Sequence, residues 1–259
     1  MKTISIFLSL LLMILQLLLF VFILFFLVQR SFYYQTKESV SINSNTKIDL
    51  ISDDGIKIDF NMIDNNSKID LIFILGVPLD RSEYEKYALE FSSRTKYNIF
   101  YYVMRGQCGN PGFTSEIGIF RDLKKISDFL KGRKTTKYGY SWSFGPALLC
   151  KLANLVDFAK IVLHNPFEKM ENVVKQRTFG TLTLPFLVDK WDNKKAIRNL
   201  SCEIIVVASE FDKNIYPKNS EDLVKFNKKA KLVFAKGESH STITLIGQNL
   251  EEYLYKYII

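Results

Sequence analysis

The stretch at residues 138–145 constrains the fold of this chain most strongly. An aromatic, β-prone run enters a cluster of small residues there, and an apolar helical pattern follows at residues 146–153. The chain must therefore turn sharply from a strand into a helix. In such an elbow a nucleophilic serine sits at a strained backbone angle, and the residues two before and two after it must be small because strand and helix nearly collide. Ser143, flanked by Ser141 and Gly145, meets this requirement.

A second register of the same elbow is open. Ser141 also fits the pattern of a serine between two small residues, because Gly139 precedes it by two and Ser143 follows it by two. Ser143 is favoured because the helix then begins at once, with Pro146 in its first turn, where a missing N–H leaves no helical hydrogen bond unmade. The structural alternative is a buried, serine-rich turn without a chemical role.

The N-terminus is apolar and carries no charge between Ile4 and Val28. At about 1.5 Å rise per residue, a helix over this run is long enough to cross the roughly 30 Å hydrocarbon core of a bilayer. The run passes into Gln29 and Arg30 without the small-residue cleavage site of a signal peptide. We therefore predict an uncleaved, single-pass transmembrane signal anchor over residues 1–30. The flanking charges do not decide which side of the membrane carries the remainder of the chain.

Residues 31–46 are polar and lack apolar periodicity, which predicts a stalk before a single domain at residues 47–259. Hydrophobic residues make up 47% of the 259, enough for one substantial core. The net charge of +8 is scattered among acidic residues, which argues against nucleic-acid binding and leaves a mild bias toward anionic membrane. Cys108, Cys150 and Cys202 have no metal-ligand spacing, so we expect buried core thiols and no metal.

Strand and helix patterns alternate along this domain. Residues 47–51 and 56–63 flank an Asp53-Asp54-Gly55 turn and predict an antiparallel hairpin. Further strands are predicted at 69–75, 97–104, 137–140, 159–163, 203–208 and 231–234, and helices at 84–91, 117–130, 146–153, 222–226 and 242–257. Such alternation predicts an α/β fold with a mostly parallel sheet and helices on both faces. Ligands of such sheets lie at the carboxyl ends of the strands, where the elbow also lies.

A nucleophilic serine needs a base, and the usual base is histidine. The chain has two histidines. His240 lies in a polar loop after the last predicted strand and is the candidate general base, whereas we interpret His164 as a wall or core histidine. The loop after the strand at 203–208 offers Asp212, with Glu210 as the weaker candidate, as the acid that orients the imidazole.

The candidates occur in the order Ser143, Asp212, His240, which is the order of one of three unrelated classes of serine hydrolase. A site for acyl transfer also needs N–H donors aimed at the developing oxyanion. We assign these donors to the backbone of Phe144, directly after the serine, and of Val77, in the loop after the strand at 69–75. The alternative for Val77 is an ordinary strand-terminating turn.

From about residue 47 onward the sequence resembles the α/β-hydrolase superfamily, and within it the membrane-anchored, bud-emergence-related abhydrolase-domain serine hydrolases. The motifs that carry the resemblance are, in order, Asp53-Asp54-Gly55-Ile56-Lys57, Arg105-Gly106-Gln107-Cys108-Gly109, the run at 114–122, Asn165-Pro166-Phe167, Leu184-Pro185-Phe186 and Lys190-Trp191-Asp192-Asn193. The resemblance implies a sheet of about eight strands and serine-dependent hydrolysis of an ester, thioester or amide. The sequence departs from the family in three places: Leu75-Gly76-Val77 replaces its usual His-Gly-Asn, Ser141 replaces its glycine, and Pro217 lies one residue further from Asp212 than the usual spacing.

These observations together predict a membrane-anchored serine hydrolase that cleaves an acyl ester or thioester of a lipid or acylated substrate. Ser143, His240 and Asp212 would form its catalytic triad, without a metal or organic cofactor. The short stretch at 164–202 allows only a minimal lid. The expected partners are the lipid bilayer and the acyl substrate. The alternative is a catalytically weakened or inactive, membrane-tethered α/β-hydrolase that acts as a binding protein.

Overall fold

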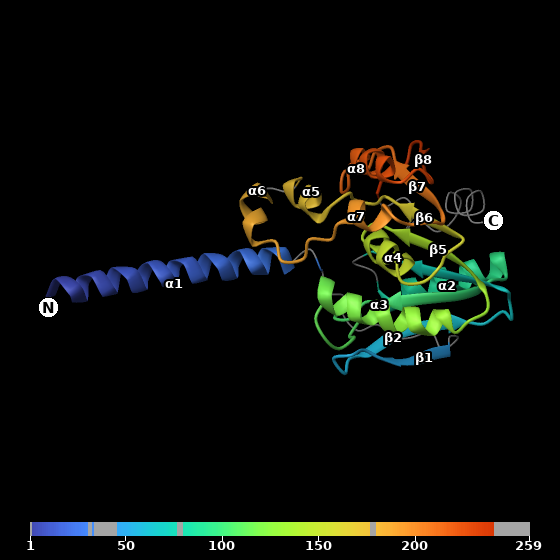
Figure 1. Ribbon diagram of the computed structural model, residues 1–259, viewed down its shortest axis with the longest axis horizontal. Helices are drawn as coiled ribbons and strands as arrows, with labels where there is room; N and C mark the ends of the chain where they lie inside the picture. The colour runs from blue at the N-terminus through green and yellow to red at the C-terminus, as the bar shows by residue number, and fades with distance from the viewer. Residues whose placement is uncertain (1, 31–32, 34–45, 77–79, 177–179, 241–259) are drawn as a thin grey trace.

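The chain folds into an eight-stranded sheet covered by helices, with one long helix projecting from it (Figure 1). The computed structural model describes residues 2–30, 33, 46–76, 80–176 and 180–240. The strand order is β1-β2-β4-β3-β5-β6-β7-β8. The predicted α/β class and the sheet of about eight strands are confirmed.

The antiparallel part of the sheet lies at one edge. There β1 (Thr46–Ile51) and β2 (Lys57–Ile63) form the predicted hairpin, and β2 also pairs antiparallel with β4 (Asn98–Val103). All other neighbours are parallel; the strands are β3 (Ile69–Ile74), β5 (Thr136–Trp142), β6 (Lys160–His164), β7 (Glu203–Ser209) and β8 (Ala230–Ala235). The carboxyl ends of these parallel strands therefore meet at a common edge.

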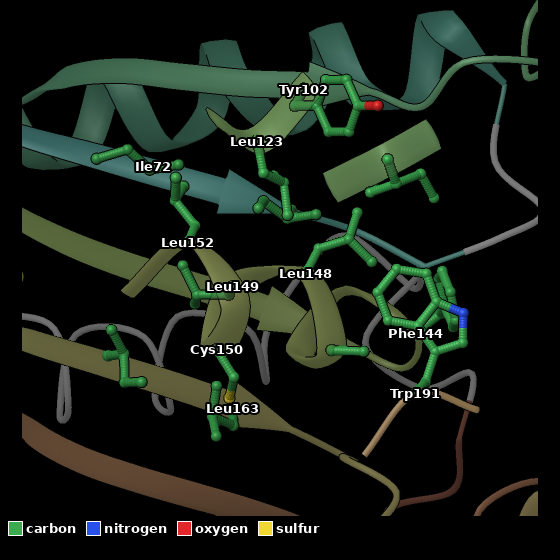
Figure 2. Packing of buried hydrophobic residues seen from close by; sticks show 14 of the residues in the cluster. Ile72, Tyr102, Leu123, Phe144, Leu148, Leu149, Cys150, Leu152, Leu163 and Trp191 are labelled. Atoms are coloured by element: carbon green, nitrogen blue, oxygen red, sulfur yellow. The ribbon is translucent and has the colours of Figure 1, made fainter. Parts of the chain in front are cut away.

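Helices cover both faces of the sheet, as predicted. They are α2 (Arg81–Thr95), α3 (Glu116–Lys131), α4 (Gly145–Ala153), α5 (Met170–Lys175), α6 (Gly180–Thr183), η1 (Leu184–Phe186), α7 (Asn193–Ile197), α8 (Lys218–Leu223) and η2 (Val224–Phe226). Successive strand residues point to opposite faces. In β3, Ile72 belongs to the apolar cluster under α3 and α4, whereas Phe73 belongs to the cluster under α2. Figure 2 shows the first cluster, in which Leu148 and Leu149 of α4 lie over the sheet.

Several predicted boundaries need correction. The helix predicted at 84–91 begins three residues earlier, because Glu83 accepts a hydrogen bond from the backbone N–H of Asp80 and closes the first turn. The strand predicted to end at Tyr140 continues through Trp142. The short helices α5, α6, α7 were not predicted, since four to six residues hold little helical periodicity. The closing helix predicted at 242–257 lies outside the described residues.

The projecting helix is α1 (Lys2–Arg30). Within it, residues 4–27 are long and apolar enough to cross a membrane, by length and composition, and they are not buried against the rest of the chain. Most of the predicted stalk lies outside the described residues. Tyr33 within it is buried and belongs to the apolar cluster under α3 and α4.

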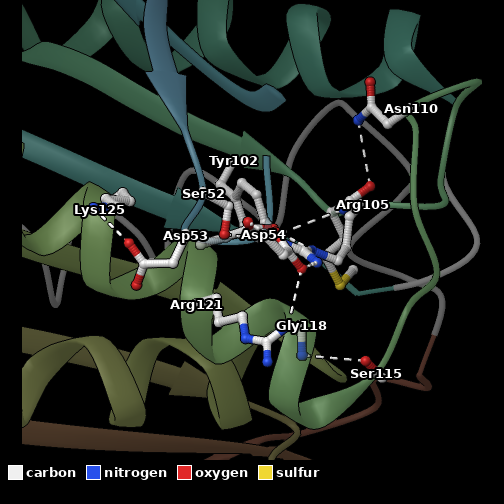
Figure 3. Close-up of polar contacts among 12 residues, drawn as sticks. Ser52, Asp53, Asp54, Tyr102, Arg105, Asn110, Ser115, Gly118, Arg121 and Lys125 are labelled. Atoms are coloured by element: carbon white, nitrogen blue, oxygen red, sulfur yellow. Dashed lines mark hydrogen bonds and ion pairs between the residues drawn. The ribbon is translucent and has the colours of Figure 1, made fainter. Parts of the chain in front are cut away.

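A buried arginine ties the edge hairpin to the body (Figure 3). Arg105 follows β4 and binds the carboxylates of Asp122 in α3 and of Asp54 in the β1–β2 turn, as well as the hydroxyl of Ser52. The hydrogen bond from Arg105 holds the pKa of Asp54 well below its usual range. The sequence motifs at residues 53–57, 105–109 and 114–122 therefore meet in one charge-assisted network. This network stabilises the edge of the sheet rather than the elbow.

The three cysteines are free and buried, as predicted. Cys150 lies in α4 and packs close to Leu163 of β6 (Figure 2). Burial raises the pKa of its thiol, so the group stays protonated and behaves as a small apolar side chain.

Candidate active site

The elbow between β5 and α4 has a strained backbone. Ser143 has a φ of +61°, in the left-handed region that residues other than glycine rarely adopt. Its N–H donates to the carbonyl oxygen of His164 at 2.9 Å, which holds the turn against β6. The sharp turn predicted from the small residues is therefore present at Ser143.

The small residue at the start of α4 is a steric requirement. A Cβ atom added to Gly145 would lie 1.9 Å from the carbonyl oxygen of Ile74 in β3. Ser141 also faces this crossing, because its Cβ would lie 3.3 Å from the same added atom. Ser141 is fully buried and its hydroxyl donates to the carbonyl oxygen of Val162 at 3.3 Å. Of the two serines, Ser143 occupies the turn and Ser141 belongs to the strand.

Ser143 begins a chain of hydrogen bonds through His240 to Asp212. The Oγ atom of Ser143 lies 2.9 Å from Nε2 of His240, and Nδ1 of His240 lies 2.6 Å from Oδ2 of Asp212. The other carboxylate oxygen of Asp212 accepts the backbone N–H groups of Asn214 and Ile215, both at 2.8 Å. All three members of the chain are buried. Its serine, imidazole and carboxylate have the connectivity of a triad for acyl transfer.

The alternative acid lies elsewhere. Glu210 is exposed, and its carboxylate accepts the backbone N–H of Gly237 at 2.9 Å. This contact closes the loop after β8 onto the loop after β7. Glu210 therefore braces the loop that carries His240, and Asp212 contacts the imidazole.

His164 lies behind the site as a core residue, in agreement with the sequence interpretation. It is buried at the end of β6, with Tyr140 Oη 3.4 Å from its Nδ1 and Ser209 Oγ 3.5 Å from its Nε2. Burial, and to a lesser degree the nearby His240, lowers the pKa of His164 to about 3. The side chain is neutral near pH 7 and adds no charge beside His240.

Trp142 was not among the predicted site residues. Its indole ring lies 5.1 Å from the imidazole of His240, centroid to centroid, with the two planes tilted by 39°. The Trp142 side chain is 7% exposed. It therefore shields one side of the imidazole from water. Its position directly before Ser143 is the signal that could have identified it.

The space expected for an oxyanion borders a glycine. A Cβ atom added to Gly76 would lie 3.0 Å from the backbone N of Phe144 and 3.1 Å from Oγ of Ser143. The missing side chain thus leaves room beside both atoms, where a carbonyl oxygen under attack would sit. Phe144 is the first residue of the predicted donor pair. The second, Val77, lies outside the described residues.

Aromatic side chains form a wall around Phe144. Its ring meets Tyr33 and Trp191 edge-on, at centroid distances of 5.7 and 5.1 Å, and stacks on Phe167 at 6.1 Å. Figure 2 shows Trp191 directly against Phe144. Tyr33 accepts a hydrogen bond from Nε1 of Trp191 at 2.7 Å and donates one to Asp189 at 2.9 Å. A residue from the segment after α1 thus contributes to the wall beside the elbow.

Metal coordination is not suggested by the described part of the chain. No group of three or more His, Cys, Asp or Glu side chains there could hold a metal ion. Ser143, His240 and Asp212 are hydrogen-bonded to one another.

Comparison with known proteins gives no match to a protein-family model or to a curated protein sequence. Solved structures do match. The esterase Pf2001 of Pyrococcus furiosus superposes with a TM-score of 0.69 at 14% identity, over 87% of this chain and 97% of that chain. MGS-M2, an α/β hydrolase from a Medee basin deep-sea metagenome library, superposes with a TM-score of 0.61 at 14% identity, over 79% of this chain and 94% of that chain. The chain has the α/β-hydrolase fold.

Acetyl xylan esterase 1 from Thermoanaerobacterium sp. JW/SL YS485 is a further match, with a TM-score of 0.64 at 13% identity, over 86% of each chain.

In the α/β-hydrolase fold the nucleophile lies on the strand-to-helix elbow, and the triad follows in the order Ser, acid, His. Here Ser143 follows β5, Asp212 follows β7 and His240 follows β8. The three candidates therefore lie after three different parallel strands, at the edge of the sheet where the carboxyl ends of these strands meet.

Proposed function

We propose that this chain is a membrane-anchored serine hydrolase that cleaves a carboxylic ester or thioester. The observation that carries the proposal is the buried hydrogen-bonded chain from Ser143 through His240 to Asp212, which begins at a strained elbow. Strain in a buried turn is retained where the surrounding structure enforces it, and it is concentrated at functional sites. The similar solved structures named as esterases support the same chemistry.

The mechanism has two halves. The Oγ atom of Ser143 attacks the acyl carbonyl carbon while its proton passes to Nε2 of His240. Asp212 accepts the Nδ1–H of His240 and stabilises the imidazolium that forms. The tetrahedral intermediate collapses when His240 gives the proton to the leaving alcohol or thiol, which leaves an acyl-serine. A water molecule, deprotonated by His240, then attacks the acyl carbon, and the bond to Oγ breaks as His240 returns the proton to Ser143 and the acid leaves.

The developing oxyanion needs donors on the other side of the carbonyl. We propose the backbone N–H groups of Phe144 and Val77. The room left by Gly76 beside the N atom of Phe144 supports the first assignment. Removing one such donor costs an enzyme of this kind about 10²–10³ in kcat.

Anchoring in a membrane is the second part of the proposal. The apolar helix α1 supports it, because residues 4–27 can cross a bilayer. Tyr33, three residues after α1, packs against Phe144. The active site would therefore face substrates close to the membrane surface, such as lipids and acylated proteins.

A fluorophosphonate probe tests the proposed chemistry directly. The probe forms a covalent adduct with a serine that an imidazole activates, so we expect labelling of the folded, full-length protein and none after heat denaturation. Fragmentation of the labelled peptide by mass spectrometry should place the adduct on Ser143. Labelling on Ser141 would contradict the assigned nucleophile. A folded protein that is never labelled and cleaves no ester would favour the inactive, membrane-tethered binding protein.

Replacing Gly76 with alanine tests the oxyanion site. The new methyl group would lie 2.8 Å from Cβ of Ser143 and would fill the space beside the N atom of Phe144. We expect kcat to fall by about 10²-fold, the size of one lost oxyanion contact, while KM changes less. Gly132→Ala is the matched control, since its added Cβ meets one backbone oxygen at 3.3 Å, far from the elbow. If the two variants had the same kcat, the prediction that Gly76 borders the oxyanion site would be wrong.

A further inference from the structure

Three exposed apolar side chains belong to α3, to α6 and to the chain directly after η1, which is the element that α1 contacts. Ile117 in the first turn of α3 is 68% exposed, Leu182 in α6 is 63% exposed and Val188 after η1 is 59% exposed. We call these three residues the juxtamembrane rim. Exposed apolar side chains that gather on one surface mark an interaction site more often than isolated ones do.

Hydrogen bonds from backbone N–H groups to side-chain carboxylates join the segments that carry Ile117 and Val188. The carboxylate of Asp189, next to Val188, accepts the N–H of Glu116 at 3.0 Å. In return the carboxylate of Glu116, next to Ile117, accepts the N–H groups of Lys190 and Trp191, at 2.8 and 3.0 Å. Ile117 and Val188 therefore each neighbour a residue of the same reciprocal contact, although 71 positions separate them in the sequence.

The same place is where α1 reaches the body. Helix α1 contacts η1. In Figure 1 the orange chain between α6 and α7 crosses the C-terminal end of α1, in agreement with the contact between α1 and η1. Tyr33 fixes this arrangement, because its hydroxyl is bonded to both Asp189 and Trp191. Burial, and then the charge of Asp189, raises the pKa of Tyr33 well above its usual value, so the hydroxyl keeps its proton.

We propose that the juxtamembrane rim is a second membrane contact, whose side chains enter the boundary between headgroups and acyl chains of the bilayer that α1 crosses. The inference rests on the proposed anchoring by α1. Continuity with α1 identifies the occupant: a surface held against the C-terminal end of a membrane-spanning helix meets lipid before it meets any other partner. Apolar side chains at that depth are stabilised by leaving water.

The rim has a consequence for the active site. Asp189, beside Val188, is bonded to Tyr33, and the ring of Tyr33 packs on Phe144, which follows Ser143. One layer of aromatic side chains therefore separates the rim from the elbow. Contact of the rim with the bilayer would hold the elbow close to the membrane surface. The body would rest on the bilayer rather than stand away from it.

Site-directed fluorescence quenching tests the contact without using enzyme activity. The native cysteines are buried, so a cysteine placed at an exposed position can be labelled selectively with an NBD fluorophore. The variants are Ile117→Cys, Leu182→Cys and Val188→Cys in the full-length protein, reconstituted into phosphatidylcholine–phosphatidylglycerol vesicles. Ile51→Cys is the control, because Ile51 is also 63% exposed but lies on the edge strand β1. We expect lipids with a nitroxide near the headgroup to quench the three rim labels and to leave the label at position 51 bright. Rim labels quenched no more than the control would overturn the proposal.

Enzyme rates give a second, separable measurement. The triple variant Ile117→Asp, Leu182→Asp, Val188→Asp should hydrolyse a fluorogenic lipid ester embedded in vesicles about tenfold more slowly, which corresponds to about 1.4 kcal/mol. Its rate on a short, water-soluble ester should stay that of the wild type. Equal rates of variant and wild type on the embedded ester would count against the rim. If the wild type cleaves neither ester, the proposed hydrolase function fails, while the quenching result still decides the membrane contact.

Discussion

Alanine at position 143 should reduce hydrolysis by roughly 10⁴–10⁶-fold in kcat, to the residual rate that binding and the oxyanion donors supply alone. The variant loses the oxygen that forms the acyl-enzyme, and His240 has no nucleophile to deprotonate. Folding should be nearly unaffected, because alanine removes one hydroxyl from the strained turn. The measurement is kcat on a short-chain ester, with the melting temperature and fluorophosphonate labelling recorded in parallel.

Ser141→Gly is the matched control for this variant. The Ser141 hydroxyl is directed at the carbonyl oxygen of Val162 and makes no contact with His240 among the described residues. Losing it should cost about 1 kcal/mol of stability, as for a single buried hydrogen bond, and should leave kcat within a few-fold of the wild type. If Ser143→Ala stayed active and Ser141→Gly did not, the elbow would be assigned correctly, but its nucleophile would be Ser141 rather than Ser143.

Gly145→Ala should prevent the domain from reaching its native packing. The added Cβ would lie 1.9 Å from the carbonyl oxygen of Ile74 and 2.8 Å from its carbonyl carbon. These are backbone atoms of a central strand, so β3 and α4 would have to separate and open the core around Leu148. We expect a loss of about 4 kcal/mol or more in the free energy of unfolding, a large share of the stability of a typical domain.

The control for this loss is Gly55→Ala. Gly55 has a φ of +77°, which strains an alanine, but no atom lies within 4 Å of the added Cβ. Backbone strain alone should cost about 1–2 kcal/mol. Urea titrations of the detergent-solubilised full-length protein would compare the two variants. A Gly145→Ala protein no less stable than Gly55→Ala would show that β3 and α4 are not as closely packed as the structure has them.

Much of the fold was predictable because its signals are local. The apolar runs of the parallel strands, the turn at residues 53–55 and the small residues around Ser143 each report a backbone conformation that their own side chains favour. The histidine at the elbow was predictable for another reason. The chain contains two histidines, and His240 is the one in a polar loop after a predicted strand.

Other features depend on residues far apart in the sequence. The buried side chain of Tyr33 is bonded to Asp189 and Trp191, more than 150 positions away, whereas the run that follows at residues 35–45 is mostly polar. The helices α5, α6 and α7 are too short to show a period. Nothing local to Ile117 or Val188 indicates that the residues beside them, Glu116 and Asp189, are hydrogen-bonded to each other.

The sequence by itself determined that a strand turns sharply into a helix near residue 143, that this helix packs on a parallel sheet, and that an apolar helix precedes them. It left two choices open, because Ser141 and Ser143 share one pattern of small neighbours and Asp212 and Glu210 share one loop. Among the described residues, the tertiary structure brings one residue of each pair, Ser143 and Asp212, into hydrogen-bond distance of His240. Whether a side chain reaches the loop after another strand depends on where the two strands end in the sheet. Only the assembled sheet brings His240 to within 2.9 Å of Ser143 and 2.6 Å of Asp212.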